Sequence, residues 1–197
     1  MSITNYAELQ TAVAAWVNRA DLTAQLPDFI TLAEAKLNRR LRTRAQETAL
    51  SSTAPDSSYQ IAVPATAVAV KQLWIDSLNT WRIEQKPLDY VIQNQTPGKR
   101  PVYYAWSGTN WIFDGSGGSV TGVYYAKVPA LSAGANWLIG STPDLYLYAT
   151  VEQAAVYLQN ADLALGMKAL TESLIDELNG ISAADQISGG KLIARAR

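Results

Sequence analysis

The chain of 197 residues contains no cysteine and no histidine. The lack of cysteine excludes disulfides, thiolate metal sites and thiol nucleophiles. The lack of histidine removes the most frequent general base and transition-metal ligand at neutral pH, and with it Ser-His-Asp hydrolysis and His-ligated zinc or iron. We therefore expect a protein that is not an enzyme and that needs no cofactor or metal, although chemistry based on carboxylates, lysine, arginine or tyrosine stays open.

Charge is also scarce, at 17% of the residues against roughly 25% in an average soluble domain. The net charge of −1 gives no argument for wholesale binding to nucleic acid or membrane. Uncharged surface of this extent is often covered by partners. No apolar run approaches the roughly 20 residues of a membrane span, and residues 1–5 lack the regions of a signal peptide. We expect synthesis in a cytoplasm and no membrane association.

The middle of the sequence contains no recognisable phosphate-binding loop and no pair of catalytic carboxylates. The glycine-rich stretch Gly115 to Gly118 lies between predicted strands and lacks the Lys-Ser/Thr that completes a phosphate-binding loop. We expect it to form a hairpin loop. The carboxylates of this region form no obvious pair, and we expect solvated positions for them: Asp76, Glu84, Asp89 and Asp114.

Residues 1–50 have the pattern of a helical hairpin. Asn5 stands three positions before Glu8, which predicts a capped helix start, and Pro27 suits the first turn of a second helix. Apolar residues recur at helical spacing in both segments. They are Tyr6, Leu9, Val13, Trp16 and Val17 in the first, and Ile30, Ala33, Leu37 and Leu41 in the second.

Residues 59–137 have a different composition and follow a cluster of turn formers at 51–58. This region holds 12 of the 18 aromatic residues and several runs of strand formers. Short connections between the runs predict an antiparallel sheet or a small barrel, with one helical turn near Asp89 to Gln95. The predicted strands are Val68–Ile75, Trp81–Gln85, Val102–Trp106, Trp111–Phe113 and Val120–Val128.

The sequence becomes helical again over residues 142–180. Thr142 and Pro143 predict a helix start, Asn160 or Ala161 offers a kink, and an apolar face continues to Gly180. Residues 181–197 have little packing material and are predicted to form an extended tail. The fold class expected is α+β: a helical body, formed by the N-terminal hairpin and the long C-terminal helices, with an inserted sheet.

Charge of one sign is concentrated in each helical region. Five basic residues and no acidic one lie between Lys36 and Arg44, whereas residues 138–190 contain one basic residue and seven acidic ones. The basic cluster predicts either a solvated helix end or a contact surface for an acidic partner or DNA. Pairing between the two helical regions of one chain would explain part of the pattern equally well. The candidate contact residues are Lys36, Arg39, Arg40, Arg42 and Arg44, the first, third and fifth of them predicted on one side of a helix.

The last seven residues form a second candidate contact. Leu192 and Ile193 make a small apolar anchor, flanked by the basic residues Lys191, Arg195 and Arg197. A segment of this kind can become ordered when it binds a partner, and its charge favours an acidic groove. Ordinary disorder of a chain end is the alternative.

The helical regions resemble tailed-phage head-to-tail adaptor proteins. The resemblance rests on short stretches at helix starts and on helix faces, which together cover about a quarter of the chain. They are Tyr6-Ala7-Glu8-Leu9, Ala15-Trp16, Arg19-Ala20-Asp21-Leu22, Leu26-Pro27-Asp28-Phe29-Ile30, the run Ala33 to Arg42, and the run Thr142 to Ala149.

This resemblance implies a structural protein of the virion neck. Such adaptors form a homo-oligomeric ring, commonly of twelve subunits, between the portal protein and the tail or nozzle protein. Genomic DNA passes through the ring without sequence-specific binding. The partner of residues 191–197 would then be the portal or an adjacent subunit. Two other classes stay open: another neck or tail-completion protein, and an oligomeric module whose sheet recognises a glycan or a host protein. A carboxylate-based hydrolase is a remote third.

Overall fold

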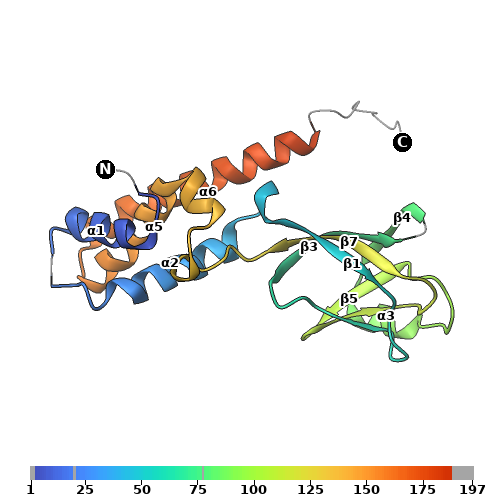
Figure 1. Ribbon diagram of the computed structural model, residues 1–197. Helices are drawn as coiled ribbons and strands as arrows, with labels where there is room; N and C mark the ends of the chain where they lie inside the picture. The colour runs from blue at the N-terminus through green and yellow to red at the C-terminus, as the bar shows by residue number, and fades with distance from the viewer. Residues whose placement is uncertain (1–2, 20, 77, 188–197) are drawn as a thin grey trace. The chain divides into compact units, whose positions relative to one another are not determined.

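The computed structural model describes residues 3–19, 21–76 and 78–187, and it divides into two compact units (Figure 1). The helical unit contains Met1–Ala45 and Val128–Arg197, and the sheet unit contains Gln46–Lys127. The chain therefore leaves the helical unit once, builds the sheet, and returns. This arrangement confirms the predicted α+β fold with an inserted sheet.

Helix α1 (Tyr6–Val17) begins where the sequence predicts it. The Asn5 side chain accepts a hydrogen bond from the Glu8 amide at 3.0 Å. The Glu8 carboxylate accepts from the amide of Thr4, the residue before the cap, at 2.7 Å, which fixes the entry of the chain into the helix. The helix ends at Asn18, whose φ of 53° is left-handed.

Helix α2 (Leu26–Arg40) has Pro27 in its first turn and buries one apolar stripe. The chain becomes extended at Leu41, so the helix ends earlier than the spacing of the basic residues suggests. The buried residues of its stripe are Leu26, Phe29, Ile30, Ala33 and Leu37.

The C-terminal helices are α4 (Trp137–Ser141), α5 (Pro143–Tyr157) and α6 (Ala161–Ile187). The predicted kink is a complete break, because Gln159 has a left-handed φ of 55° and Asn160 accepts from the Leu163 amide at 3.2 Å. Helix α6 continues beyond Gly180 to Ile187, so the tail expected from residue 181 is wrong for 181–187. Packing explains the extension, since Ser182 is buried. Residues 188–197, with the predicted anchor, lie outside the described residues.

The strands form one curled, mixed sheet in the order β1-β7-β3-β4-β5-β6-β2. Helix α3 (Leu88–Gln93) lies in the connection from β4 to β5. The strands are β1 (Glu47–Thr53), β2 (Gln60–Ala62), β3 (Ala67–Ile75), β4 (Leu78–Gln85), β5 (Tyr103–Ser107), β6 (Asn110–Phe113) and β7 (Val120–Ala126).

The sheet differs from the expectation in three details. It begins at Glu47 rather than near residue 59, because β1 (Glu-Thr-Ala-Leu-Ser-Ser-Thr) has few strand formers and is stabilised by pairing with β7. Residues 128–137 belong to the helical unit. Strands β4 and β5 are parallel, with Glu84 opposite Tyr103, because the connection through α3 returns the chain in the same direction.

Each unit has its own apolar core. In the sheet unit, Trp111 and Phe113 of β6 are fully buried against β3 residues such as Leu73. Gly122 of β7 is required by close packing, because a Cβ there would lie 2.3 Å from the Gln72 carbonyl oxygen of β3.

Candidate interaction surfaces

Lys36 is paired inside the helical unit. Its Nζ lies 2.6 Å from Glu152 Oε2 and 2.9 Å from Oε1, joining α2 to α5 across 116 residues of sequence. Glu152 is 8% exposed, so the two charges neutralise each other away from bulk water. This contact supports the intramolecular interpretation of the charge pattern for Lys36.

The remaining basic residues do not continue a helical line. Helix α2 ends at Arg40, and Arg44 begins a 3₁₀ turn (Arg44–Gln46) that leads into β1. The prediction that Lys36, Arg40 and Arg44 share one helix face is therefore wrong for Arg44. Tertiary contacts end the helix here: the Arg42 amide donates to Asn179 Oδ1 at 2.7 Å.

Two more hydrogen bonds fix this segment on α6. Asn179 Nδ2 donates to the Arg40 carbonyl at 3.1 Å, and the Arg44 amide donates to Ser182 Oγ at 3.2 Å. The Arg42 guanidinium donates to the carbonyls of Asn38 and Leu41, which stabilises the end of α2. The exposed members of the predicted cluster are Arg39, Arg40 and Arg44.

The chain's return from the sheet unit is anchored in a similar way on α2. Asn38 Oδ1 accepts from the Val128 amide at 2.7 Å, and Glu34 Oε1 accepts from the Leu131 amide at 2.7 Å. Tyr146 also donates to Glu34 Oε1 at 3.4 Å. Burial raises the pKa of Glu34, and the hydrogen bonds from Leu131 and Tyr146 oppose that rise. Burial likewise raises the pKa of the Tyr146 phenol, which stays neutral.

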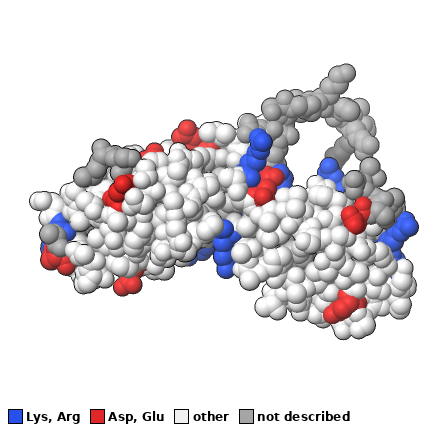
Figure 2. Space-filling model, viewed as in Figure 1, with Lys and Arg blue, Asp and Glu red and all other residues white. Residues whose placement is uncertain are grey.

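Helix α6 presents acidic side chains to solvent. Asp162, Asp176 and Glu177 are exposed, and Lys168 is the basic residue among them. The helical unit thus has exposed arginines at the end of α2 and exposed carboxylates along α6. Figure 2 shows how thinly charges of either sign are spread over the visible face.

Large apolar side chains are also exposed on the helical unit. Trp16 is 50% exposed and its ring contacts the ring of Tyr148 in a tilted arrangement, with 5.7 Å between the ring centres. Leu165 is 65% exposed. A hollow of about 250 Å³ lies at the α5–α6 junction, next to Val156. The exposed apolar residues of this unit are Trp16, Leu32, Val156, Tyr157, Leu165, Leu170 and Ile181.

The tyrosine pairs of the sheet unit divide between core and surface, as predicted. Tyr104 and Tyr124 are buried, whereas Tyr103 and Tyr125 are partly exposed. Tyr103 meets Tyr90 edge-on at 5.3 Å, and Lys86 Nζ lies 5.5 Å from the centre of the Tyr103 ring.

Asp114 is fully buried, so its expected solvated position is wrong. Its Oδ1 accepts from the amides of Val102 and Tyr103 at 2.8 and 2.9 Å, and Oδ2 lies 2.7 Å from Lys99 Nζ. The carboxylate therefore holds the start of β5 against the end of β6. In the sequence, Asp114 is a single Asp directly after an apolar strand. This pattern is too common to identify a buried carboxylate from the sequence alone.

The stretch Gly115 to Gly118 supports this packing and does not form a hairpin. It connects β6 to β7, which are not neighbours in the sheet. A Cβ on Gly115 would lie 2.1 Å from the Lys99 carbonyl oxygen, so glycine allows the two loops to touch. In residues 3–187 as far as they are described, no three acidic side chains gather into a metal site.

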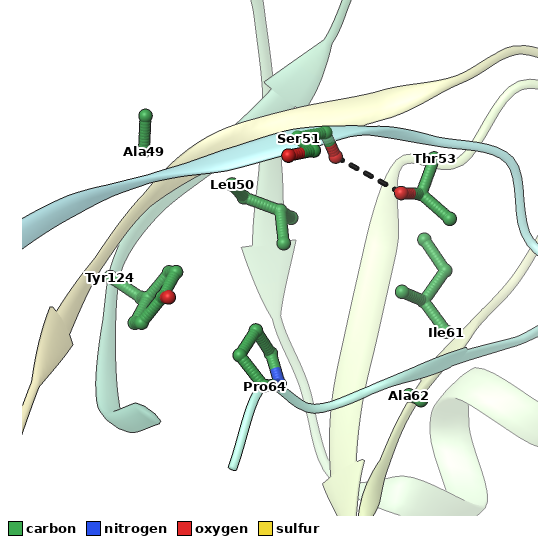
Figure 3. Close-up of a pocket in the computed structure, with 8 residues that line it drawn as sticks. All are labelled: Ala49, Leu50, Ser51, Thr53, Ile61, Ala62, Pro64 and Tyr124. Carbon is green, nitrogen blue, oxygen red and sulfur yellow. Dashed lines mark hydrogen bonds between the residues drawn. The ribbon is translucent and has the colours of Figure 1, made fainter. Parts of the chain in front are cut away.

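The two edge strands of the sheet border a hollow of about 370 Å³ (Figure 3). No charged side chain of the described residues lines it. The lining residues are Ala49, Leu50, Ser51, Thr53, Ile61, Ala62, Pro64 and Tyr124, and we call this site the edge hollow.

The helical unit exposes large apolar side chains, with exposed arginines at the end of α2 and exposed carboxylates along α6, and the sheet has two edge strands. These are features of a protein that binds other proteins. The family comparison agrees: the model of the SU10 adaptor protein family matches residues 4–193. The chain belongs to this family of phage head-to-tail adaptors, which confirms the resemblance seen in the sequence. No curated protein matches the chain.

Family membership gives the protein a structural role in the phage particle, in contact with other head–tail proteins. Among the helices of the described ranges, none combines the length and the apolar character that a membrane crossing requires.

Proposed function

We propose that the protein forms a ring, of twelve subunits, between the portal protein and the tail or nozzle protein of the virion neck. Genomic DNA passes through this ring without sequence-specific contacts. The observation that carries the proposal is the surface of the helical unit, where large exposed apolar side chains accompany charges separated by sign. Membership in the adaptor family supports the same role.

The ring contact that we propose is heterologous. The exposed Arg39 and Arg40 of one subunit face the α6 carboxylates of the next, and the apolar side chains fill the interface between them. A contact between two different surfaces of the same protein closes into a ring when the rotation permits it. Separated charges of opposite sign set the register of such a contact.

The sheet unit serves as the tail-side contact in this proposal. It exposes Trp81, Tyr90 and Ile92, and the paired rings of Tyr90 and Tyr103 provide a rigid aromatic surface. Aromatic residues of this kind are frequent in the energetic centres of protein interfaces.

Electron microscopy of the purified full-length protein with and without portal tests the ring. We expect monomers in dilute solution and rings on portals, because interfaces of ordinary size need pre-organisation to be tight. A stable dimer at low concentration that ignores the portal would contradict the proposal.

Charge reversal tests the proposed contact directly. Arg40→Glu should leave the unfolding transition almost unchanged, since exposed ion pairs contribute about 0–1 kcal/mol, but it should block assembly because the like-charge contact is repeated around the ring. Arg82→Glu, an exposed arginine of β4 in the sheet unit, is the matched control and should assemble. If Arg40→Glu forms normal rings, the proposed contact is contradicted and the basic cluster is interpreted as a solvated helix end.

A further inference from the structure

Strands β3 and β4 separate part-way along their length. Leu73 pairs with Ile83, and the same antiparallel register would next place Lys71 opposite Gln85. Among the described residues this next pair does not form, and β4 continues beside β5 instead. The pairing of β3 with β7 shifts in register next to Lys71, which marks a bulge. Because a bulge bends the strand that carries it, the sheet is split at this point.

The backbone of Gln85 faces the split. The amides of Glu84 and Lys86 donate to the carbonyls of Val102 and Tyr104, each at 2.9 Å, so both residues are directed toward β5. Since neighbouring residues of a strand direct their backbone groups to opposite sides, the amide and carbonyl of Gln85 are directed toward β3. No described residue of β3 pairs with them. A donor and an acceptor side by side on a strand edge are suited to an extended peptide.

A hollow of about 460 Å³ lies in the split, between residues 70–73 of β3 and 82–85 of β4, with Tyr104 of β5, and we call it the split site. It shares no lining residue with the edge hollow. Its volume lies within the range of about 300–1,000 Å³ that is typical of ligand pockets. Leu73, Ile83 and Tyr104 are each at most 5% exposed, so part of the lining is apolar and shielded from water.

The charged side chains of the split site leave a cation without an ion pair. Lys71 Nζ lies 2.6 Å from Glu47 Oε1, and Glu84 Oε2 lies 3.1 Å from Lys86 Nζ, so these two lining residues are neutralised. Arg82 is exposed and forms no ion pair with a described residue. A guanidinium binds a carboxylate through two parallel hydrogen bonds, so Arg82 favours an acidic ligand.

We propose that the split site binds an extended segment of another head–tail protein, with an acidic residue on the outer face of that segment. The backbone of the segment pairs with Gln85, an apolar side chain lies against Ile83, and the next residue along, Asp or Glu, meets Arg82. Arg82 and Ile83 alternate between the two faces of β4 in the same way. The assignment of the segment to the tail side rests on the tail-side contact proposed above.

Titration of the ¹⁵N-labelled full-length protein with a synthetic peptide tests the site. The probe has about seven residues, in which valine and glutamate alternate, and both ends are blocked. We expect saturable shifts of the Lys71 and Gln85 amide signals. Hydrogen exchange of the Gln85 amide should slow at least about tenfold, because this amide gains an acceptor. Shifts at Ala49 of the edge hollow instead, or no shifts at all, would overturn the proposal.

Two control peptides test the chemistry of recognition without changing the protein. The same peptide with lysine in place of glutamate should bind at least about tenfold more weakly, because its charge repels Arg82. Methylation of every backbone nitrogen removes the donors of the peptide and should abolish binding. If either control binds as tightly as the probe, the segment is not recognised as an acidic strand and the proposal fails.

Charge reversal on the protein is the matching experiment. Arg82→Glu should exchange the preference, so that the lysine peptide binds more tightly than the glutamate peptide. Arg100→Glu, an exposed arginine of the same unit that does not line the split site, is the control and should retain the preference for glutamate. If Arg82→Glu does not fold, Arg82→Gln replaces it and should bind both peptides equally. A preference that survives either change at Arg82 would contradict the proposal.

Peptide binding is measured on the protein without portal, whereas rings are observed by electron microscopy with portal. Arg82→Glu should still form rings, because the proposed ring contact lies on the helical unit. Peptide binding without rings would therefore remove the ring and leave the split site, and rings without peptide binding would remove the split site alone.

Discussion

The helical unit and the sheet unit differ in how many large apolar side chains they expose and in what satisfies the carboxylate that each of them buries. The exposed large apolar side chains of the described residues lie mostly on the helical unit, whereas the sheet unit exposes Trp81, Tyr90 and Ile92. The sheet unit buries a carboxylate, Asp114, that its own backbone satisfies. The difference indicates that the helical unit has the larger surface that requires a partner, while the sheet unit is more nearly complete in itself.

The two units also differ in whether they are built from one segment of the chain or from two. The sheet unit is one continuous segment, Gln46–Lys127, but the helical unit joins the two ends of the chain. The ion pair between Lys36 and Glu152, which are 116 residues apart in sequence, connects these two segments. Long-range closure of this kind costs conformational entropy, which buried contacts between α2 and α5 must offset.

The largest effect is expected in the sheet unit, from Asp114→Ala. Two backbone amides and Lys99 lose their acceptor, and the free energy of unfolding of this unit should fall by about 3–5 kcal/mol. Hydrogen exchange should show β5 and β6 opening while α5 stays protected. Asp76→Ala, an exposed carboxylate of the same unit, is the control and should change stability by less than about 1 kcal/mol. Equal losses from both variants would show that burial of Asp114 is unimportant.

A smaller effect, of about 2–4 kcal/mol, is expected in the helical unit from Lys36→Met, which leaves Glu152 buried without its partner. The double variant Lys36→Met/Glu152→Met should recover most of the loss, because an apolar pair needs no compensation. Thermal unfolding of the four proteins of this cycle gives the coupling between the two residues. A double variant whose loss is the sum of the single losses would contradict a coupled pair.

The smallest effect concerns pH and Glu34, which anchors the chain's return from the sheet unit. Burial raises the pKa of Glu34, so the folded state favours the protonated form more than the unfolded state does. Its contribution to stability is therefore complete below the unfolded pKa and declines as pH rises through the folded pKa.

Glu34→Gln keeps an acceptor for the Leu131 amide but does not ionise. We expect the free energy of unfolding of Glu34→Gln to increase relative to the wild type as pH is raised from 4 to 7. This increase should be smaller than the losses expected from Asp114→Ala and Lys36→Met. Melting temperatures across this range measure the difference, and Glu8→Gln, an exposed carboxylate of α1 with a lowered pKa, should show the opposite trend. A difference that does not vary with pH would contradict the burial of Glu34.

The sequence by itself determined the starts of α1, α2 and α5 and the α+β organisation, because these depend on local groups, whereas helix α4 was not predicted. Asn5 and Glu8 satisfy amides within one turn, Pro27 has no amide to satisfy, and strands such as β3 are rich in strand formers. The resemblance to phage adaptors also came from such local stretches, and the family match confirms it. The roles of the basic cluster and of residues 191–197 stay predictions.

Only the tertiary structure decided where those patterns end and which charges reach solvent. Helix α2 stops at Arg40 because Asn179 binds the backbone beyond it, α6 passes Gly180 because Ser182 is buried, and β1 forms because β7 pairs with it. Asp114 and Lys36 have the sequence surroundings of surface residues, yet Asp114 is buried by partners 11 to 15 residues away and Lys36 is half-buried beside a partner 116 residues away. Hydrogen bonds and ion pairs between distant segments leave no periodic signal in a sequence, and a single sequence therefore cannot assign them.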